Sequence, residues 1–197
     1  MGSGFWVEPD DPLITAEPHA VKELRNGKDL AARPRGVYAI DFFGLSEEES
    51  RRKFPGAFQR VLNGVKPERE QSQRAAYRAK WWTFAEARPD LRQAKLGLGR
   101  YIATVMTAKH RTFLFLEERL LPDQGLIAIT LNDALALGSL SSRVHVAWAL
   151  AAGGRLGVGN DPRYNNSACF ETFPFPDPTP AQAARIRDLA EQLDAHR

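Results

Sequence analysis

The stretch Tyr101-Ile102-Ala103-Thr104-Val105-Met106 is followed, after five further residues, by Thr112-Phe113-Leu114-Phe115-Leu116. Both stretches are dense in β-branched and aromatic residues, so each predicts a strand. Further strands are predicted over 36–43 and 125–130, and helical patterns fill much of the remaining chain. The sequence therefore predicts an α+β (mixed α/β) fold, with a curved, mostly antiparallel sheet packed with helices and a C-terminal helix.

Two helix starts carry clear capping signals. Ser46 and Glu49 have the spacing of a capping box, at the head of a helix with an apolar stripe. Pro55 must kink or split that helix, because proline lacks a backbone N–H group. Thr179, followed by a proline and Gln182, predicts the start of the C-terminal helix.

Other boundaries rest on single residues. Asn132 or Asp133 is expected to cap a helix, which Gly138-Ser139 breaks and restarts before it ends at Gly153. Residues 1–35 contain four prolines and are expected to form an irregular lead-in.

Composition limits the class of protein. The chain has 197 residues, of which 43% are hydrophobic, and this suits one sizeable domain with a buried core. Cys169 is the one cysteine, which excludes an intramolecular disulfide and leaves it an ordinary half-buried residue. No apolar run reaches the roughly 18 residues of a membrane span, and no signal peptide is visible. We therefore expect a cytoplasmic protein with no membrane partner.

Positive charge is concentrated in the middle of the chain. Residues 51–111 contain 15 Lys and Arg against four Asp and Glu, whereas the rest contains 12 against 20. Such segregation suits a polyanion, and nucleic acid is the first candidate, because neutralised phosphates release counterions. The alternative is a solvated face that acidic residues of the fold neutralise.

The most basic helix is predicted over 67–80 and is polar almost all round. Arg69 and Lys80 share one face at helical spacing, while Arg74 and Arg78 share another. A helix without a broad apolar stripe has little reason to pack on a core. These side chains therefore become candidates for phosphate contacts.

Two neighbouring features have structural interpretations. Glu70 and Arg74 have the i,i+4 spacing of a supporting ion pair within the same predicted helix. The residues Trp81-Trp82-Thr83-Phe84 predict a short aromatic strand, whose tryptophans are expected to belong to the core.

The sequence contains no complete site for chemistry. The glycine-rich stretch 153–159 follows a helix and lacks the Gly-Lys-Ser/Thr of a phosphate loop, so we expect an ordinary loop. The stretch Asn160-Asp161-Pro162-Arg163-Tyr164 has one proline where an amino-methylating tetrapeptide needs two. The four histidines have no metal-ligand spacing. We predict neither catalytic residues nor a metal site, and therefore a binding domain.

Four stretches carry a resemblance through their order and spacing. They are 25–30 (Arg-Asn-Gly-Lys-Asp-Leu), 66–69 (Lys-Pro-Glu-Arg) with Trp81-Trp82, 101–103 with Lys109-His110-Arg111, and 140–148 with 164–167 and 170–176. Together they resemble the target-recognition region of MmeI-like enzymes, which are single-chain bacterial restriction–modification methyltransferases. More loosely, they are similar to the specificity domains of TaqI-type adenine methyltransferases.

The resemblance implies an organisation and an activity for the parent protein. Methyl transfer from S-adenosylmethionine to the N6 amine of adenine belongs to a methyltransferase domain N-terminal to this chain, so no cofactor is expected here. Residues 1–35 become the lead-in from that domain, 36–178 the target-recognition domain, and 179–197 a C-terminal helix.

The implied partner is double-stranded DNA. Phosphate contacts are expected from Arg69, Arg74, Arg78 and Lys80. Base contacts are expected from Lys109, His110, Arg111, Asn165 and Asn166, because Asn pairs bidentately with adenine and Arg with guanine. An alternative for Asn165-Asn166 is a simple turn. The alternative function is a basic protein-interaction module that docks an acidic partner chain, and a third is a complete small enzyme.

Overall fold

The structure is a computed structural model, which describes residues 3–156 and 161–197. The chain forms two compact units, each with its own hydrophobic core. Unit 1 holds the described residues up to Arg25, with Pro34–Pro89 and Arg119–Leu121. Unit 2 holds Asn26–Arg33, Asp90–Glu118 and the described residues from Pro122 onward. The α+β class is confirmed, although the strands form separate sheets rather than one. The predicted division at residues 35 and 178 stays a prediction.

Unit 1 is built on a short sheet in the order β1-β3-β2-β6. The strands are β1 (Trp6–Val7), β3 (Tyr38–Ile40), β2 (Val21–Arg25) and β6 (Leu121–Pro122). β3 pairs antiparallel with both β1 and β2, with Ala39 opposite Trp6 and Lys22.

The expectation that residues 1–35 are irregular is wrong. They contain η1 (Ser3–Phe5), β1, α1 (Leu13–Ala16), β2 and α2 (Gly27–Ala31). Asn26 caps α2 through a capping box with Asp29. These elements are too short to show a periodic pattern, and the strands β1 and β2 are formed by pairing with β3.

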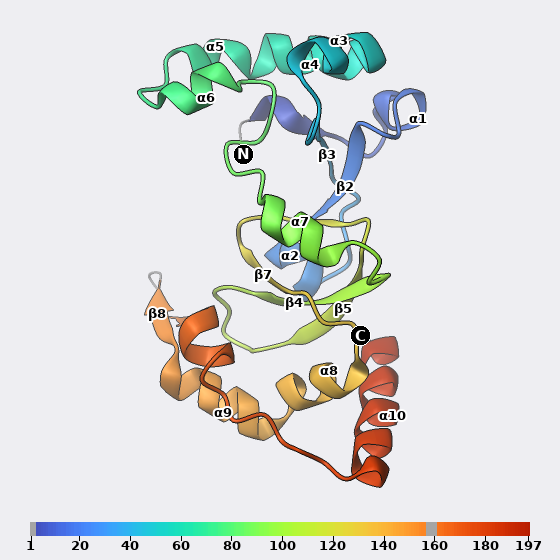
Figure 1. Ribbon diagram of the computed structural model, residues 1–197, viewed down its shortest axis with the longest axis vertical. Helices are drawn as coiled ribbons and strands as arrows, with labels where there is room; N and C mark the ends of the chain where they lie inside the picture. The colour runs from blue at the N-terminus through green and yellow to red at the C-terminus, as the bar shows by residue number, and fades with distance from the viewer. Residues whose placement is uncertain (1–2, 157–160) are drawn as a thin grey trace. The chain divides into compact units, whose positions relative to one another are not determined.

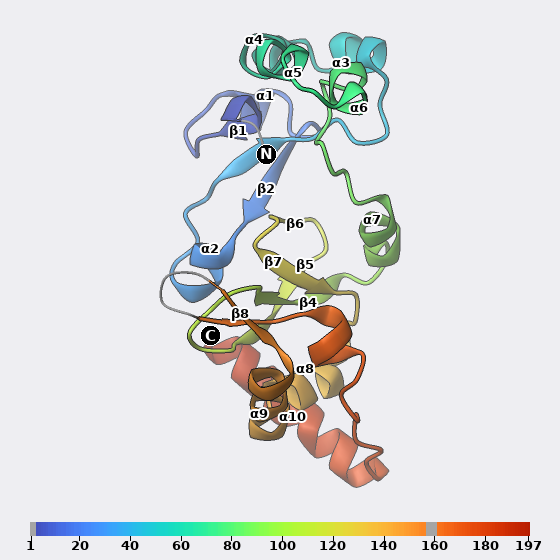
Figure 2. The same cartoon turned by 90° about the vertical axis from the view of Figure 1, so that its left-hand side faces the viewer.

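Four helices of unit 1 follow the sheet and gather beside one another (Figure 2). They are α3 (Glu47–Lys53), α4 (Pro55–Gly64), α5 (Lys66–Glu70) and α6 (Ala75–Ala79). The capping box is confirmed, since Glu49 N donates to Ser46 Oγ over 3.1 Å and Ser46 N donates to Glu49 Oε2 over 2.9 Å. Pro55 splits the predicted helix and begins α4.

The single helix predicted over 67–80 is wrong. α5 ends at Glu70, and α6 begins after Arg74, whose backbone is extended. The Arg74 N–H group donates to Ser72 Oγ over 3.2 Å, which favours a turn over a continuous helix. The polar segment has no apolar stripe whose burial could hold one straight helix together.

The residues that follow form turns instead of the predicted strand Trp81–Phe84. Trp81 is 4% exposed and packs edge-on against Phe58, with ring centroids 5.6 Å apart. Trp82 Nε1 donates to the carbonyl of Leu45 over 3.1 Å. The prediction that the tryptophans belong to the core is confirmed for Trp81, whereas Trp82 is partly buried and packs against that core.

Unit 2 is built on the sheet β5-β4-β7. The strands are β4 (Arg100–Val105), β5 (Phe113–Glu117) and β7 (Leu126–Ile129), close to the predicted ranges. Both neighbours are antiparallel to β4, and Ile102 lies opposite Phe115 and Ile129. Helix α7 (Pro89–Lys95) precedes this sheet.

The remaining elements of unit 2 follow β7. They are α8 (Ala134–Ser141), α9 (Arg143–Ala152), the hairpin β8 (Gly154–Leu156) and β9 (Asp161–Arg163), the π-helical turn η2 (Asn166–Phe170), and α10 (Pro180–His196). Thr179 and Gln182 form the predicted capping box of α10. Asp133 caps α8 by accepting from Leu135 N over 2.9 Å.

The helix break expected at Gly138-Ser139 lies instead at Ser142, which caps α9. Gly138 lies within α8, and α10 packs against this helix (Figure 1). A Cβ atom at Gly138 would lie 2.6 Å from Ile186 Cγ2. This glycine therefore serves the close approach of two helices and does not end one.

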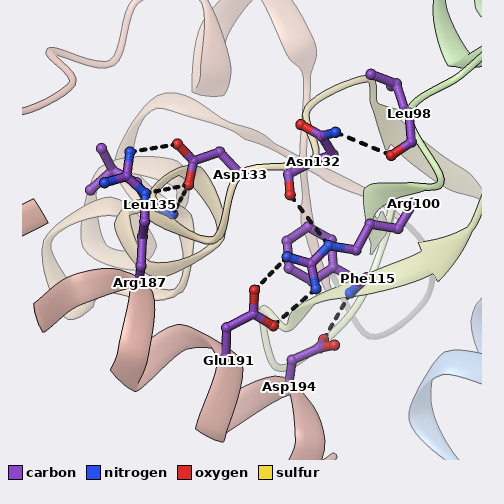
Figure 3. Close-up of polar contacts among 9 residues, drawn as sticks. All are labelled: Leu98, Arg100, Phe115, Asn132, Asp133, Leu135, Arg187, Glu191 and Asp194. Atoms are coloured by element: carbon purple, nitrogen blue, oxygen red, sulfur yellow. Dashed lines mark hydrogen bonds and ion pairs between the residues drawn. The ribbon is translucent and has the colours of Figure 1, made fainter. Parts of the chain in front are cut away.

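Ion pairs join α10 to the rest of unit 2 (Figure 3). Arg100 pairs through both terminal nitrogens with the carboxylate of Glu191, and its Cζ atom lies 3.7 Å from the centre of the Phe115 ring. Arg187 donates to both oxygens of Asp133, each over 2.8 Å. These hydrogen bonds lower the pKa of Asp133 to about 2.

A carboxylate of α10 also contacts the sheet edge. Asp194 Oδ1 accepts from the backbone N–H of Phe115 over 2.8 Å (Figure 3). β5 is an outer strand of its sheet, so this contact occupies a donor that would otherwise be open to another chain.

We predict that Glu191→Gln lowers the free energy of unfolding by about 1 kcal/mol at low salt, because a half-exposed bidentate pair lies near the upper end of surface ion pairs. Arg185→Gln, which removes the exposed Arg185–Asp188 pair on the same helix, is the matched control and is expected to have no effect. Chemical denaturation at low and high salt measures both. Equal losses in the two variants would contradict the bridging role of Glu191.

Candidate nucleic-acid interface

The predicted DNA-contacting residues fall into two groups, one in each unit. The unit 1 group comprises Arg69, Arg74, Arg78 and Lys80. The unit 2 group comprises Lys109, His110, Arg111, Asn165 and Asn166. Each group is described on its own below.

In unit 1, two arginines gather around a tyrosine. The Cζ atoms of Arg69 and Arg74 each lie 5.0 Å from the ring centre of Tyr77. Arg74 Nη1 also donates to the Tyr77 hydroxyl over 2.5 Å. Arg78 Nη1 donates to the carbonyl of Ser72 over 2.5 Å, and Lys80 is exposed at the end of α6. The split between α5 and α6 is what brings Arg69 and Arg74 to the same ring.

The positive charge of this group is not neutralised within the described residues, where none of the four side chains has a carboxylate within ion-pair distance. The expected Glu70–Arg74 pair is not made, because the two residues do not share a helix. The alternative in which acidic neighbours neutralise these four residues does not hold here. Other arginines of the chain are paired, such as Arg60 with Asp11.

In unit 2, Lys109 and His110 are exposed in the loop between β4 and β5. Arg111, in the same loop, is half-buried and donates to four groups of the chain: the carbonyls of Val105, Met106 and Pro162 and the hydroxyl of Thr104. It thereby ties the loop to β9. Its guanidinium supports the loop and is not presented freely, so Lys109 and His110 are the more accessible candidates for base contacts.

Asn165 and Asn166 line an open hollow of about 410 Å³. Arg163 and Glu171 line it as well, and neither was among the sequence-based candidates. Asn166 is exposed and opens the π-helical turn η2, whereas Asn165 is half-buried beside it. The hollow thus places two amides, a guanidinium and a carboxylate at one surface, and these are the groups that form hydrogen bonds with base edges.

A buried histidine supports this surface from beneath. His145 is 0% exposed, and its Nε2 atom lies 3.0 Å from the Tyr164 hydroxyl, one residue before Asn165. Its Nδ1 atom has no hydrogen-bond partner among the described residues. Burial lowers the pKa of His145 from 6.5 to about 4, so the ring is neutral at pH 7. The structure thus gives His145 a role in packing beneath the hollow.

Two kinds of feature, a metal site and a membrane-spanning helix, are absent from the parts of the chain that the structure describes. No three His, Cys, Asp or Glu side chains there are grouped to hold a metal ion. No helix there is both long and apolar enough to cross a membrane. Cys169 is fully buried and donates to the carbonyl of Ala149 over 3.7 Å. Of the glycine-rich stretch 153–159 and the stretch 160–164, residues 157–160 lie outside the described ranges.

The family model for "MmeI, target recognition domain" matches residues 44–177. The chain belongs to the MmeI target recognition domain family. The match covers most of the chain, including α3 to α9 and both groups of candidate residues.

The fold agrees with this family. A solved structure described as "Structure of Type IIL restriction-modification enzyme MmeI in complex with DNA has implications for engineering of new specificities" matches with a TM-score of 0.72 and 21% identity. The match covers 95% of this chain and 25% of that chain, so this target recognition domain spans a quarter of its structural relative. No curated protein matches the sequence.

Sequence reasoning missed two residues of this target recognition domain that organise the candidate surfaces. The role of Tyr77 was missed because the single helix predicted over 67–80 would hold Tyr77 and Arg69 apart. The break between α5 and α6 brings the two side chains into contact. His145 was noted only as lacking metal-ligand spacing, and its contact with Tyr164 depends on the packing of α9 against η2.

We predict that the free energy of unfolding falls by about 2 kcal/mol between pH 7 and pH 5 through His145 alone. The folded-state pKa is depressed, so the unfolded chain takes up a proton in this window while the folded chain does not. The stabilisation is therefore present above pH 6.5 and is lost as the pH falls toward 4. Denaturation of wild type and His145→Gln across this range measures the effect; equal slopes in the two proteins would contradict it.

Proposed function

We propose that this chain binds duplex DNA and helps to select its sequence, as the target-recognition part of a restriction–modification enzyme. The observation that carries the proposal is the family match over residues 44–177. The structural relative is an MmeI enzyme in complex with DNA, and this agrees with the proposal.

The distribution of charge supports a nucleic-acid partner. The residues from 51 to 111 carry an excess of Lys and Arg, and the arginines around Tyr77 have no acidic partner in the described residues. Phosphates of duplex DNA would supply the missing negative charge and release condensed counterions. Arg69, Arg74, Arg78 and Lys80 are therefore assigned to phosphate contacts.

The second group suits contacts with bases. Lys109 and His110 are accessible donors, and Asn165 and Asn166 can each offer a donor and an acceptor to one base edge. Arg111 contributes by fixing the loop that carries Lys109 and His110. Arg163 and Glu171 join this group through the hollow that they share with the two asparagines.

The proposal extends to the parent protein. A methyltransferase domain N-terminal to this chain would bind S-adenosylmethionine and methylate the N6 amine of adenine, in the cytoplasm of a bacterium. The observation in its favour is that the structural relative is a restriction–modification enzyme about four times as long as the matched region. An upstream reading frame with a cofactor loop and an Asn-Pro-Pro-aromatic tetrapeptide would support this extension.

We predict that this chain binds duplex DNA with an affinity that falls steeply with salt, with a slope of about 0.9 per neutralised phosphate. Fluorescence anisotropy of a labelled duplex over a salt series measures the slope. A polyglutamate chain of a length similar to that of the duplex serves as a competitor, because it carries negative charge but no bases. If polyglutamate displaces the duplex at equal charge concentration, the basic face is a protein-docking module and the DNA proposal is wrong.

We predict that the double variant Arg74→Glu, Arg78→Glu weakens binding by on the order of tenfold or more on every duplex alike, because phosphate contacts carry no sequence information. Asn165→Ala with Asn166→Ala is expected to change the ranking among duplexes instead. Arg185→Glu, an exposed charge reversal on α10, is the matched control. Unchanged affinity in the double variant would remove Arg74 and Arg78 from the interface.

A further inference from the structure

Arg69 is a buried cation with no counterion. Its side chain belongs to α5, it is 8% exposed, and its guanidinium has no hydrogen-bond acceptor or carboxylate among the described residues. The adjacent acids, Glu68 and Glu70, are exposed and form no ion pair with it. Burial of an unpaired charge is costly. The position of Arg69 is therefore unfavourable unless a group from outside the chain pairs with its guanidinium.

A second cation contacts the same tyrosine ring. Arg69 and Arg74 each have Cζ 5.0 Å from the Tyr77 ring centre, so the two guanidiniums cannot be farther apart than twice that distance. Arg74 is fixed by its hydrogen bond to the Tyr77 hydroxyl. Two like charges held near one ring repel each other, and the face of one tyrosine offsets only part of that cost. An anion between them would relieve the repulsion.

The connection between α5 and α6 is itself held in place. Arg78 donates to the carbonyl of Ser72 over 2.5 Å, and Ser72 Oγ accepts from the Arg74 N–H group over 3.2 Å. The turn that brings Arg74 back toward Arg69 is thus closed by its own hydrogen bonds. The two guanidiniums are arranged before any ligand arrives.

Arg111 is an arginine of the same chain whose side chain supports the fold through hydrogen bonds. It is half-buried, and its guanidinium donates to the carbonyls of Val105 and Pro162 and to the hydroxyl of Thr104. Arg69 makes no such bonds. A residue whose purpose is to hold the fold together would use its five donors, so Arg69 is kept for a group from outside the chain.

We propose that Arg69, Arg74 and Tyr77 form a seat for one phosphate group, with Tyr77 as the positioning residue that sets both guanidiniums. Guanidinium donors match phosphate oxygens in pairs. The Tyr77 hydroxyl accepts from Arg74 and keeps its own proton to donate to the phosphate. The seat takes its phosphate from the DNA backbone, and this last step rests on the function proposed above.

The first test removes the charge of Arg69 with little change in shape, in Arg69→Met. We expect the midpoint of thermal unfolding at low salt to stay the same or rise, because an unpaired buried charge is lost. Inorganic phosphate should raise the midpoint of the wild type above that in chloride of equal ionic strength, and this shift should disappear in Arg69→Met. Arg185→Met, which removes one positive charge at an exposed position of α10, is the control. This variant should keep the shift of the unfolding midpoint caused by phosphate.

Two outcomes of this first test overturn the seat. A lower midpoint of Arg69→Met in chloride would show that Arg69 supports the fold as Arg111 does. A phosphate shift of equal size in wild type and Arg69→Met would show adventitious binding elsewhere. Arg69→Lys keeps the positive charge but lacks the paired donors of the guanidinium, and it remains informative if Arg69→Met does not fold. It should fold like the wild type and retain only part of the phosphate-induced shift of the midpoint.

The second test addresses Tyr77 through the salt dependence of duplex binding. Tyr77→Leu and Arg69→Met should each lower the slope of log affinity against log salt by about one, since one phosphate contact is lost. Tyr77→Phe keeps the ring beneath the arginines and should retain most of the wild-type slope. A wild-type slope in Tyr77→Leu would overturn the positioning role.

The two tests separate this proposal from the proposed function. If the wild type shows the Arg69-dependent phosphate shift but binds no duplex, the seat stands and the DNA function fails. If the wild type binds duplex and neither variant alters the phosphate shift or the slope, the function stands and the seat is wrong.

Discussion

Positive charge that the fold leaves without a partner sets the arginines around Tyr77 apart from the other charged groups of the chain. Several arginines elsewhere in the chain pair with carboxylates: Arg60 with Asp11, Arg100 with Glu191, and Arg187 with Asp133. Around Tyr77 the described residues offer none. Since burial of a charge is costly, such an arrangement is stable only when solvent or an external anion completes it. The two short helices α5 and α6, with the connection between them, carry that charge.

In unit 2, by contrast, hydrogen bonds and packing contacts fix the positions of polar groups. The sheet β5-β4-β7 is tied to α10 by the contacts of Arg100 and Asp194, and the loop after β4 is tied to β9 by Arg111. His145 and Tyr164 pack beneath the hollow that Asn165 and Asn166 line. Selection among base edges needs donors and acceptors at fixed positions, and rigid support of this kind provides them. The surface that would discriminate sequences therefore depends on neutral, buried contacts, whereas the surface that would bind phosphates depends on charge.

Much of this could be predicted from the sequence, wherever one local signal was strong enough. The strands β4, β5 and β7 follow from dense β-forming residues, and Ser46, Pro55 and Thr179 mark helix boundaries through their own side chains. Where elements depend on distant partners, local patterns failed. The strands β1 and β2 are short and are made by pairing with β3. Gly138 lies within α8, against which α10 packs, and the helix over 67–80 breaks because it has nothing apolar to bury. The role of Tyr77 follows from that break.

This member of the MmeI target recognition domain family is proposed to select a DNA sequence. Enrichment from a pool of duplexes with a randomised segment, followed by sequencing of the bound fraction, tests it most directly. One short motif is expected to be enriched over successive rounds, and this enrichment should persist at salt concentrations that remove bulk binding. A bound fraction with the composition of the starting pool would contradict sequence selection by this chain.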